Sequence, residues 1–347
     1  MKTNPTKTIL NRRQFIRNGA AALAGAALLP AADTYSKSNN GRDDINGSLH
    51  RSPGFYRFPF GDMEVTVLND GHFEFPFDLI SIDDSLEFLA YNADRETREE
   101  YVRSRRLPTD RVPLYLSPVL IDSGNQRTLV DSGLGTGEDI PTAGRLGLSL
   151  EAAGIAPESI DQVLITHAHP DHIGGLMDPA SGAPLFPEAE VVLSEKERAF
   201  WLGEDAIWLG DDAEADLVLE TARTVLRGID DRLRTVEGET EVVNGIRAIP
   251  SPGHSPGHVC YAIESEGQQL LLTGDAIIFT HASFEHPEWH AFPDANRDEA
   301  ARTRKRLLDR AATDEMFILG FHFPFPGLGY AIRDGDAYRW HHAGWAS

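Results

Sequence analysis

A short polar segment directly after an apolar stretch carries four side chains of the kinds that bind metal ions. The segment reads Thr166-His167-Ala168-His169-Pro170-Asp171-His172. Residues two apart in extended backbone point the same way, so His167 and His169 can converge on one cation. Pro170 keeps His169 out of the helical region and suits the first position of a helix. The turn that follows would direct Asp171 and His172 toward a second cation, so this spacing predicts a loop that serves two metal ions.

Two cations need more ligands, and three later segments supply them where predicted strands end. These segments are Pro252-Gly253-His254-Ser255-Pro256-Gly257-His258, Thr273-Gly274-Asp275 and Gly320-Phe321-His322. Glycine lets the backbone approach a crowded site, and proline stiffens the loop. A single Gly-His or Gly-Asp pair is more often only a turn. Their shared position at strand ends is what indicates a site.

Composition limits the classes of protein that remain. The 347 residues include 32 Lys plus Arg and 54 Asp plus Glu, a formal net charge of −22, which excludes a basic nucleic-acid binder. A hydrophobic content of 41% with 25% charged residues is typical of a globular protein with a large core. The one cysteine, Cys260, stands in an apolar strand and is expected in the core. Any metal must therefore be held by nitrogen and oxygen ligands.

The segments that would position these loops alternate between strand-like and helix-like patterns. Alternating apolar residues on both sides of Asn69-Asp70-Gly71, from Val65 to Phe77, predict a β-hairpin. Further strands are expected at 114–121, 127–131, 162–166, 191–193, 242–249, 259–263 and 270–272, and helices at 143–153, 213–226 and 296–311. Mixed strands with interspersed helices predict sheets covered by helices on their outer faces.

The N-terminus has the character of a targeting leader. Residues 1–32 contain five Lys or Arg, no acidic residue, and an 11-residue apolar run from Gly19 to Leu29. That run is shorter than the roughly 20 residues that span a bilayer, which argues against a permanent membrane anchor. The preceding segment, from Asn11 to Arg17, resembles a twin-arginine export signal. We expect a signal peptide at 1–32, a flexible linker at 33–54, one domain at 55–347, and export to the periplasm by the twin-arginine machinery.

Taken together, the metal-type loops resemble those of the metallo-β-lactamase-fold hydrolase superfamily. Segments away from these loops, 53–57, 200–202 and 322–327, are similar to the branch of methyl parathion hydrolase and the quorum-quenching lactonases. The resemblance implies an α+β fold, a four-layer αβ/βα sandwich with two mixed β-sheets flanked by helices. It also implies one metal ion at His167, His169 and His254, a second at Asp171, His172 and His322, and Asp275 as the bridge between them.

The same resemblance assigns supporting and substrate-contacting roles. Asp131 and His258 would brace the metal loops from behind without binding a metal. Trp201 matches an aromatic residue of the substrate pocket in that branch. Two residues that follow Asp275, namely His281 and Phe284, are further candidates for the pocket wall. A homodimer is expected from the related enzymes alone.

The implied activity is hydrolysis of a small-molecule ester, lactone or phosphotriester. Two divalent ions lower the pKa of a shared water, so that a metal-bridging hydroxide attacks without a separate base. Asp275 and Asp171 would be the catalytic carboxylates, and Asp171 could pass a proton to the leaving group. Mixed histidine and carboxylate ligands favour Zn²⁺, with Mn²⁺, Co²⁺ and Fe²⁺ as alternatives.

Three other functions stay open at this point. A mononuclear iron oxygenase of the persulfide type and a non-catalytic metal-binding protein would both use part of the same residues. The complete set of seven ligand-type residues favours the binuclear hydrolase over either of them. A β-lactamase is less favoured, because it would lack a bridging carboxylate where this chain has Asp275.

Overall fold

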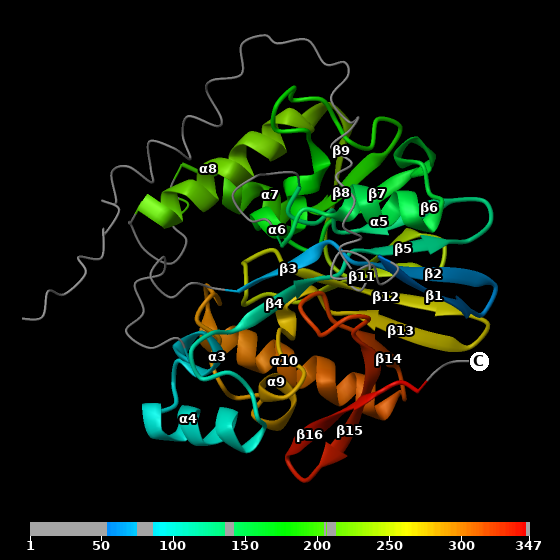
Figure 1. Ribbon diagram of the computed structural model, residues 1–347. Coiled ribbons are helices and arrows are strands. Elements are labelled where there is room, and N and C mark those ends of the chain that lie inside the picture. The colour runs from blue at the N-terminus through cyan, green and yellow to red at the C-terminus, as the bar shows by residue number, and fades with distance from the viewer. Residues whose placement is uncertain (1–53, 75–85, 136–141, 205, 207–212, 345–347) are drawn as a thin grey trace, which may run out of the picture.

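Two large β-sheets lie face to face with helices on their outer sides (Figure 1). The computed structural model describes residues 54–74, 86–135, 142–204, 206 and 213–344. The predicted signal peptide and nearly all of the predicted linker lie outside these residues. Within the described part, no helix is both long and apolar enough to cross a membrane.

The first sheet has seven strands in the order β1-β2-β5-β6-β7-β8-β9. Its strands are β1 Phe55–Phe60, β2 Met63–Leu68, β5 Val119–Asp122, β6 Arg127–Val130, β7 Gln162–Leu164, β8 Glu190–Ser194 and β9 Leu233–Val236. Pairing is antiparallel from β1 to β6 and parallel from β6 to β9. Four helices are close to it in sequence: α5 Leu146–Ala153, α6 Pro170–Ile173, α7 Glu195–Leu202 and α8 Ala213–Gly228.

The second sheet also has seven strands, in sequence order from β10 to β16. Its strands are β10 Thr240–Val243, β11 Ile246–Pro250, β12 Val259–Ser265, β13 Gln268–Leu272, β14 Phe317–Leu319, β15 Leu328–Asp334 and β16 Ala337–His342. Only β13 and β14 pair in parallel. Helices α9 Ala282–Glu285 and α10 Arg297–Thr313 lie between β13 and β14 in the chain. A small extra sheet pairs β3 Gly71–Glu74 with β4 Pro113–Leu116, and helices α3 Glu87–Ala90 and α4 Arg95–Ser104 lie between these two strands in the chain.

Three buried clusters show that the sheets and helices form four layers. On β5, Val119 and Ile121 point into the core between the sheets, while Leu120 points to the core beneath α5 and α8. Leu307 and Leu308 of α10 pack on the outer face of the second sheet. This alternation follows from the two-residue period of a strand, and it confirms the predicted α+β sandwich.

The predicted hairpin around Asn69-Asp70-Gly71 is wrong. Strand β2 pairs with β1 and β5 in the large sheet, whereas β3 turns away and pairs with β4. Asp70 is completely buried and accepts hydrogen bonds from the backbone N–H groups of Leu134 and Leu146. The turn therefore serves as an anchor for distant loops, which a local strand-turn-strand pattern does not reveal.

Other predicted elements are present with shifted ends. The strand expected at 114–121 is broken at Pro118, and the one expected at 242–249 is divided before Gly245. The helix expected at 143–153 begins only at Leu146, and it ends at Gly154, whose φ of 74° is a left-handed conformation that glycine adopts easily. Helices α3, α4 and α7 and the hairpin of β15 with β16 were not predicted.

Candidate metal centre

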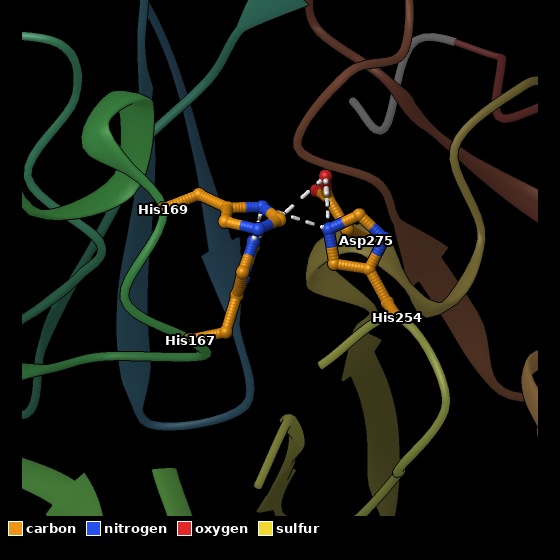
Figure 2. Close-up of side chains that lie close together, drawn as sticks. All are labelled: His167, His169, His254 and Asp275. Carbon is orange, nitrogen blue, oxygen red and sulfur yellow. Dashed lines mark hydrogen bonds and ion pairs between the residues drawn. The ribbon is translucent and has the colours of Figure 1, made fainter. Parts of the chain in front are cut away.

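The predicted ligands lie together because the strands that precede them end at one edge of the sandwich. The loop with His167 and His169 follows β7, and the loop with His254 follows β11. Asp275 follows β13, and His322 follows the parallel neighbour β14. Figure 2 shows the two histidines of the first loop facing His254 and Asp275, which come from the other sheet. The structure thus gathers all seven predicted ligands into two neighbouring groups.

The first ligand group consists of His167, His169, His254 and Asp275. His169 Nδ1 lies 2.9 Å from His167 Nε2 and 3.0 Å from His254 Nε2. Asp275 Oδ2 lies 3.3 Å from His254 Nε2. Zinc bonds of about 2.0–2.1 Å in a tetrahedron place neighbouring ligand atoms about 3.3 Å apart. The spacing of these four side chains therefore fits one tetrahedral cation.

The second ligand group consists of Asp171, His172 and His322. Asp171 Oδ2 lies 3.4 Å from His322 Nε2 and 3.6 Å from His172 Nε2. Asp275 reaches this group as well, with Oδ1 at 3.2 Å from His172 Nε2 and Oδ2 at 3.1 Å from His322 Nε2. Asp275 is therefore in contact with both ligand groups, as a bridging carboxylate would be.

Electrostatics keep His167 and His169 neutral. Burial, reinforced by the neighbouring His172 and His169, lowers the pKa of His167 well below its ordinary value. Burial and then His254 have the same effect on the pKa of His169. Neutral imidazole nitrogens that face one another offer lone pairs to a shared cation.

The carboxylates dominate on the other side of the site. Burial acts to lower the pKa of His172, but the charges of Asp275 and Asp171 outweigh it and raise that pKa well above its ordinary value. Burial acts to raise the pKa of Asp275, and the nearby His322 and His172 overcome it, so that this pKa falls well below its ordinary value. Asp275 is thus held as a carboxylate among histidines that attract it.

Two atoms at the centre test whether a cation fits there. His172 Nε2 and Asp275 Oδ1 are buried, and neither has a hydrogen-bond partner of good geometry among the described residues. Buried polar atoms are rarely left in this state, because each loses its hydrogen bonds to water. Divalent ions placed between the two groups would satisfy both atoms, so the residues present fit a metal centre.

Asp131 contacts His172 of the second group from behind. Its Oδ2 lies 2.9 Å from His172 Nδ1, and its two oxygens accept hydrogen bonds from the Thr166 backbone N–H and hydroxyl. The proton on His172 Nδ1 therefore points to Asp131, which directs Nε2 into the site. His322 Nδ1 donates in the same way to the carbonyl oxygen of Tyr115, at 2.8 Å.

His258 contacts the loop of Asp275 and lies outside both ligand groups. Its Nε2 accepts a hydrogen bond from the backbone N–H of Asp275 at 3.0 Å. Burial lowers the pKa of His258 to about 3, so the ring is neutral and carries its proton on Nδ1. Cys260 is likewise buried as predicted, and burial raises the pKa of its thiol to about 12.

The structure does not support the three residues proposed for the substrate pocket. Trp201 is completely buried and packs edge-to-face against His169, with ring centroids 5.4 Å apart, so it lies behind a ligand. Phe284 is a core residue of the second sheet. His281 is a half-exposed residue with its Nδ1 3.9 Å from Glu285 of its own helix turn. Residue type and closeness in sequence to Asp275 cannot distinguish a residue that lines a substrate pocket from a residue of the hydrophobic core.

Two buried carboxylates beside the site were missed in the sequence. Asp294 lies 3.0 Å from His254 Nδ1, through its Oδ1. Glu197, on α7, accepts hydrogen bonds from the loops that carry the histidines. Both residues are far in sequence from the ligands that they support, and no short motif connects them with those ligands. A signal existed only for Glu197, which stands three residues after the buried strand β8 in an otherwise amphipathic helix.

Comparison with known proteins finds a matching family model and similar sequences. The family model "Metallo-beta-lactamase superfamily" matches residues 112–322, more than half of the chain. An N-acyl homoserine lactonase from Bacillus cereus is 25% identical over 177 residues, which are 48% of this chain and 62% of that protein.

Solved structures agree with the fold. The structure of AidC, described as a dizinc quorum-quenching lactonase in complex with a product, matches with a TM-score of 0.77 and 23% identity, over 85% of this chain and 99% of that one. AbOPH, described as a hydrolase in the beta-lactamase superfamily, matches with a TM-score of 0.77 and 25% identity, over 86% and 100%. The chain therefore belongs to the metallo-β-lactamase superfamily, as a metal-dependent hydrolase.

Proposed function

We propose that this protein is a binuclear hydrolase that opens a lactone or cleaves a related ester or phosphotriester. The observation that carries the proposal is the position of Asp275, whose carboxylate contacts His254 of the first ligand group and both histidines of the second. One carboxylate that serves two groups is the arrangement expected when two cations lie a few ångströms apart.

The chain's own residues would hold the ions and handle the leaving group. Zinc is the favoured metal, and two divalent ions would supply an activated water and a Lewis acid for the substrate's carbonyl or phosphoryl oxygen. Asp171 has 15% of its side chain exposed, whereas Asp275, His172 and His322 have 5% or less. This exposure suits Asp171 for passing a proton to a departing alkoxide.

Lactones are the first substrate class to test. The B. cereus relative is an N-acyl homoserine lactonase, and AidC was solved with a product of that chemistry. A panel should compare N-acyl homoserine lactones, aryl esters, phosphotriesters and β-lactams on protein loaded with zinc or manganese. We expect turnover of lactones or esters, and activity on none of the four classes would contradict the proposal.

A variant of Asp171 tests its part in proton transfer. Asp171→Asn at full metal content should reduce turnover at least tenfold, because the amide cannot carry the proton. Asp231→Asn, at a carboxylate with 79% exposure, is the matched control and should leave turnover unchanged. Unchanged turnover in Asp171→Asn with two ions bound would remove this role while leaving the hydrolase assignment.

Metal analysis separates the binuclear hydrolase from the alternatives. Two ions per chain with esterase or lactonase activity support it. One iron ion per chain with oxygen consumption would instead indicate a mononuclear oxygenase, and bound metal without any turnover would indicate a non-catalytic metal-binding protein.

We also propose that the protein is exported to the periplasm and forms a homodimer. Support for export comes from the leader-like residues 1–32 and their paired Arg12-Arg13. Replacing both arginines by lysine should retain the chain in the cytoplasm, and periplasmic recovery of that variant would contradict the twin-arginine route. Light scattering on the purified protein tests the dimer.

A further inference from the structure

Glu197 is a buried acidic residue that lies between two metal loops without being a ligand itself. It stands in the first turn of α7 and has no exposed surface. Its Oε1 accepts hydrogen bonds from the Ala168 backbone N–H at 3.0 Å and from Trp201 Nε1 at 2.6 Å. Its Oε2 accepts from Ser255 Oγ at 2.7 Å and from the Gly257 backbone N–H at 2.9 Å.

Three of these hydrogen bonds, from Ala168, Ser255 and Gly257, join the loops that carry three ligands of the same group. Ala168 lies between His167 and His169, and Ser255 directly follows His254. A single carboxylate therefore fixes the distance between the first loop and the loop after β11. The two histidines of the second ligand group are instead oriented by Asp131 and by the Tyr115 carbonyl.

The hydrogen bonds around Glu197 favour its charged form. Three of its four donors are N–H groups, which cannot accept a proton from a carboxylic acid. Burial raises the pKa of Glu197, and the hydrogen bonds from Ser255 and Ala168 act against burial. Four donors around one carboxylate stabilise its charged form without an ion pair.

We propose that Glu197 is a positioning residue that sets the metal affinity of the first ligand group and leaves that of the second group unchanged. The inference rests on the proposed binuclear function. Loss of the carboxylate would let the His254 loop move relative to His167 and His169, while Asp131 would still hold His172. Partners that orient metal ligands typically change metal affinity by about 10–100-fold when they are removed.

Glu197→Gln is the direct test, because it keeps the volume of the side chain and removes the charge. The glutamine oxygen can serve two of the donors, but its NH₂ group then faces another N–H at Ala168 or Gly257. Glu195→Gln is the matched control, since it makes the same change in the same turn of α7. Zinc affinities of the full-length, metal-free proteins are measured by competition with a chromophoric chelator.

We expect wild type and Glu195→Gln each to bind two zinc ions, and we expect the affinities measured for the two proteins to be similar. Glu197→Gln should bind one ion about 10–100-fold more weakly and the other as before. Asp131→Asn should also weaken the binding of one ion. The double variant, Glu197→Gln with Asp131→Asn, should weaken the binding of both ions. Equal affinities in Glu197→Gln and wild type would overturn the inference, as would a double variant that still weakens only one ion.

Two further measurements keep the test decisive. The thermal midpoint of the metal-free protein shows whether Glu197→Gln acts through general stability, and equal weakening of both ions with a lowered midpoint would overturn the inference. Ser255→Ala removes only one of the four hydrogen-bond donors to Glu197, and it serves as the test variant if Glu197→Gln does not fold. An unchanged affinity of Ser255→Ala for both ions would then overturn the inference. Wild type that binds fewer than two ions would contradict the binuclear function itself, which separates the two failures.

Discussion

Asp294 joins His254 of the metal centre to Arg304 in the middle of α10. Its Oδ1 lies 3.0 Å from His254 Nδ1, and its Oδ2 lies 3.2 Å from Arg304 Nη2. The guanidinium also donates to the carbonyl oxygen of Ala276, the residue after Asp275, at 3.3 Å. All three charged or polar side chains are buried. Helix α10, which packs on the second sheet, therefore supports the loops of His254 and Asp275.

Arg304→Met should strongly destabilise the protein. The substitution leaves Asp294 as a buried charge without its ion-pair partner, which typically costs about 3–5 kcal/mol. Urea unfolding of the metal-free protein measures this free energy. Arg310→Met is a matched control on the same helix, because the ion pair of Arg310 with Asp314 is solvent-accessible and long, at 3.9 Å. It should change stability by less than about 1 kcal/mol, and an equal loss in both variants would refute the role of Arg304.

Removal of metal should lower the thermal midpoint, and zinc should restore it in a concentration-dependent way. Ions that bind only the folded chain stabilise it by about 2.7 kcal/mol per site when the free ion is at 100 times its dissociation constant. Differential scanning calorimetry with a chelator and with added zinc measures the change. His254→Ala lacks a ligand of the first group and should gain less from zinc than wild type. A midpoint independent of zinc would show that the two ligand groups do not hold cations.

Local patterns marked the loops that the structure gathers into the two groups, and the family resemblance assigned the ligands and the four-layer sandwich. His167 and His169 are two residues apart, and Pro170 follows them directly. The directions of their side chains could be predicted because they depend only on the local backbone geometry. Strand-end glycines at Gly253 and Gly274 marked the other loops. The layer arrangement follows because amphipathic strands and helices have few ways to bury their apolar faces.

Residues that act across the fold could not be predicted in this way. Asp294 lies 40 residues from His254, and Glu197 lies 60 residues from Gly257, so their hydrogen bonds depend on how the two sheets face each other. The same limit applies to Asp70, which was taken for a hairpin turn. Trp201 and Phe284 show the converse error, because apolar residues near a site are usually part of the core.

Asp70 should make stability fall as pH rises toward neutrality. Burial raises its pKa to about 7, against the hydrogen bonds that it accepts from Leu134 and Leu146. The folded carboxyl group keeps its proton up to about pH 7, whereas the unfolded chain releases it near 3.8. Its contribution is therefore present in full below about pH 4 and is lost as pH rises through 7, a change of about 4 kcal/mol.

The comparison of wild type with Asp70→Asn isolates this contribution. Urea unfolding of both proteins, metal-free and at several pH values from 4 to 8, gives the difference in unfolding free energy at each pH. That difference should shift in favour of the variant as pH rises. Asp110→Asn, at a side chain with 74% exposure, is the control for the loss of a charge. A difference between wild type and Asp70→Asn that does not change with pH would refute the raised pKa.

Gly257 should tolerate no side chain, because α7 begins directly against it. A Cβ at this position would lie 2.1 Å from the backbone nitrogen of Glu197 and 2.5 Å from its Cα, and backbone atoms cannot move aside as a flexible side chain can. Gly257→Ala should therefore separate Glu197 from the His254 loop, cost about 1–3 kcal/mol of stability and weaken zinc binding. Gly147→Ala is the contrasting control, since a Cβ there meets no atom within 4 Å, and alanine in helix α5 should stabilise by about 0.5–1 kcal/mol. Zinc competition and urea unfolding measure both effects, and a Gly257→Ala protein with wild-type affinity and stability would show that α7 does not hold this loop in place.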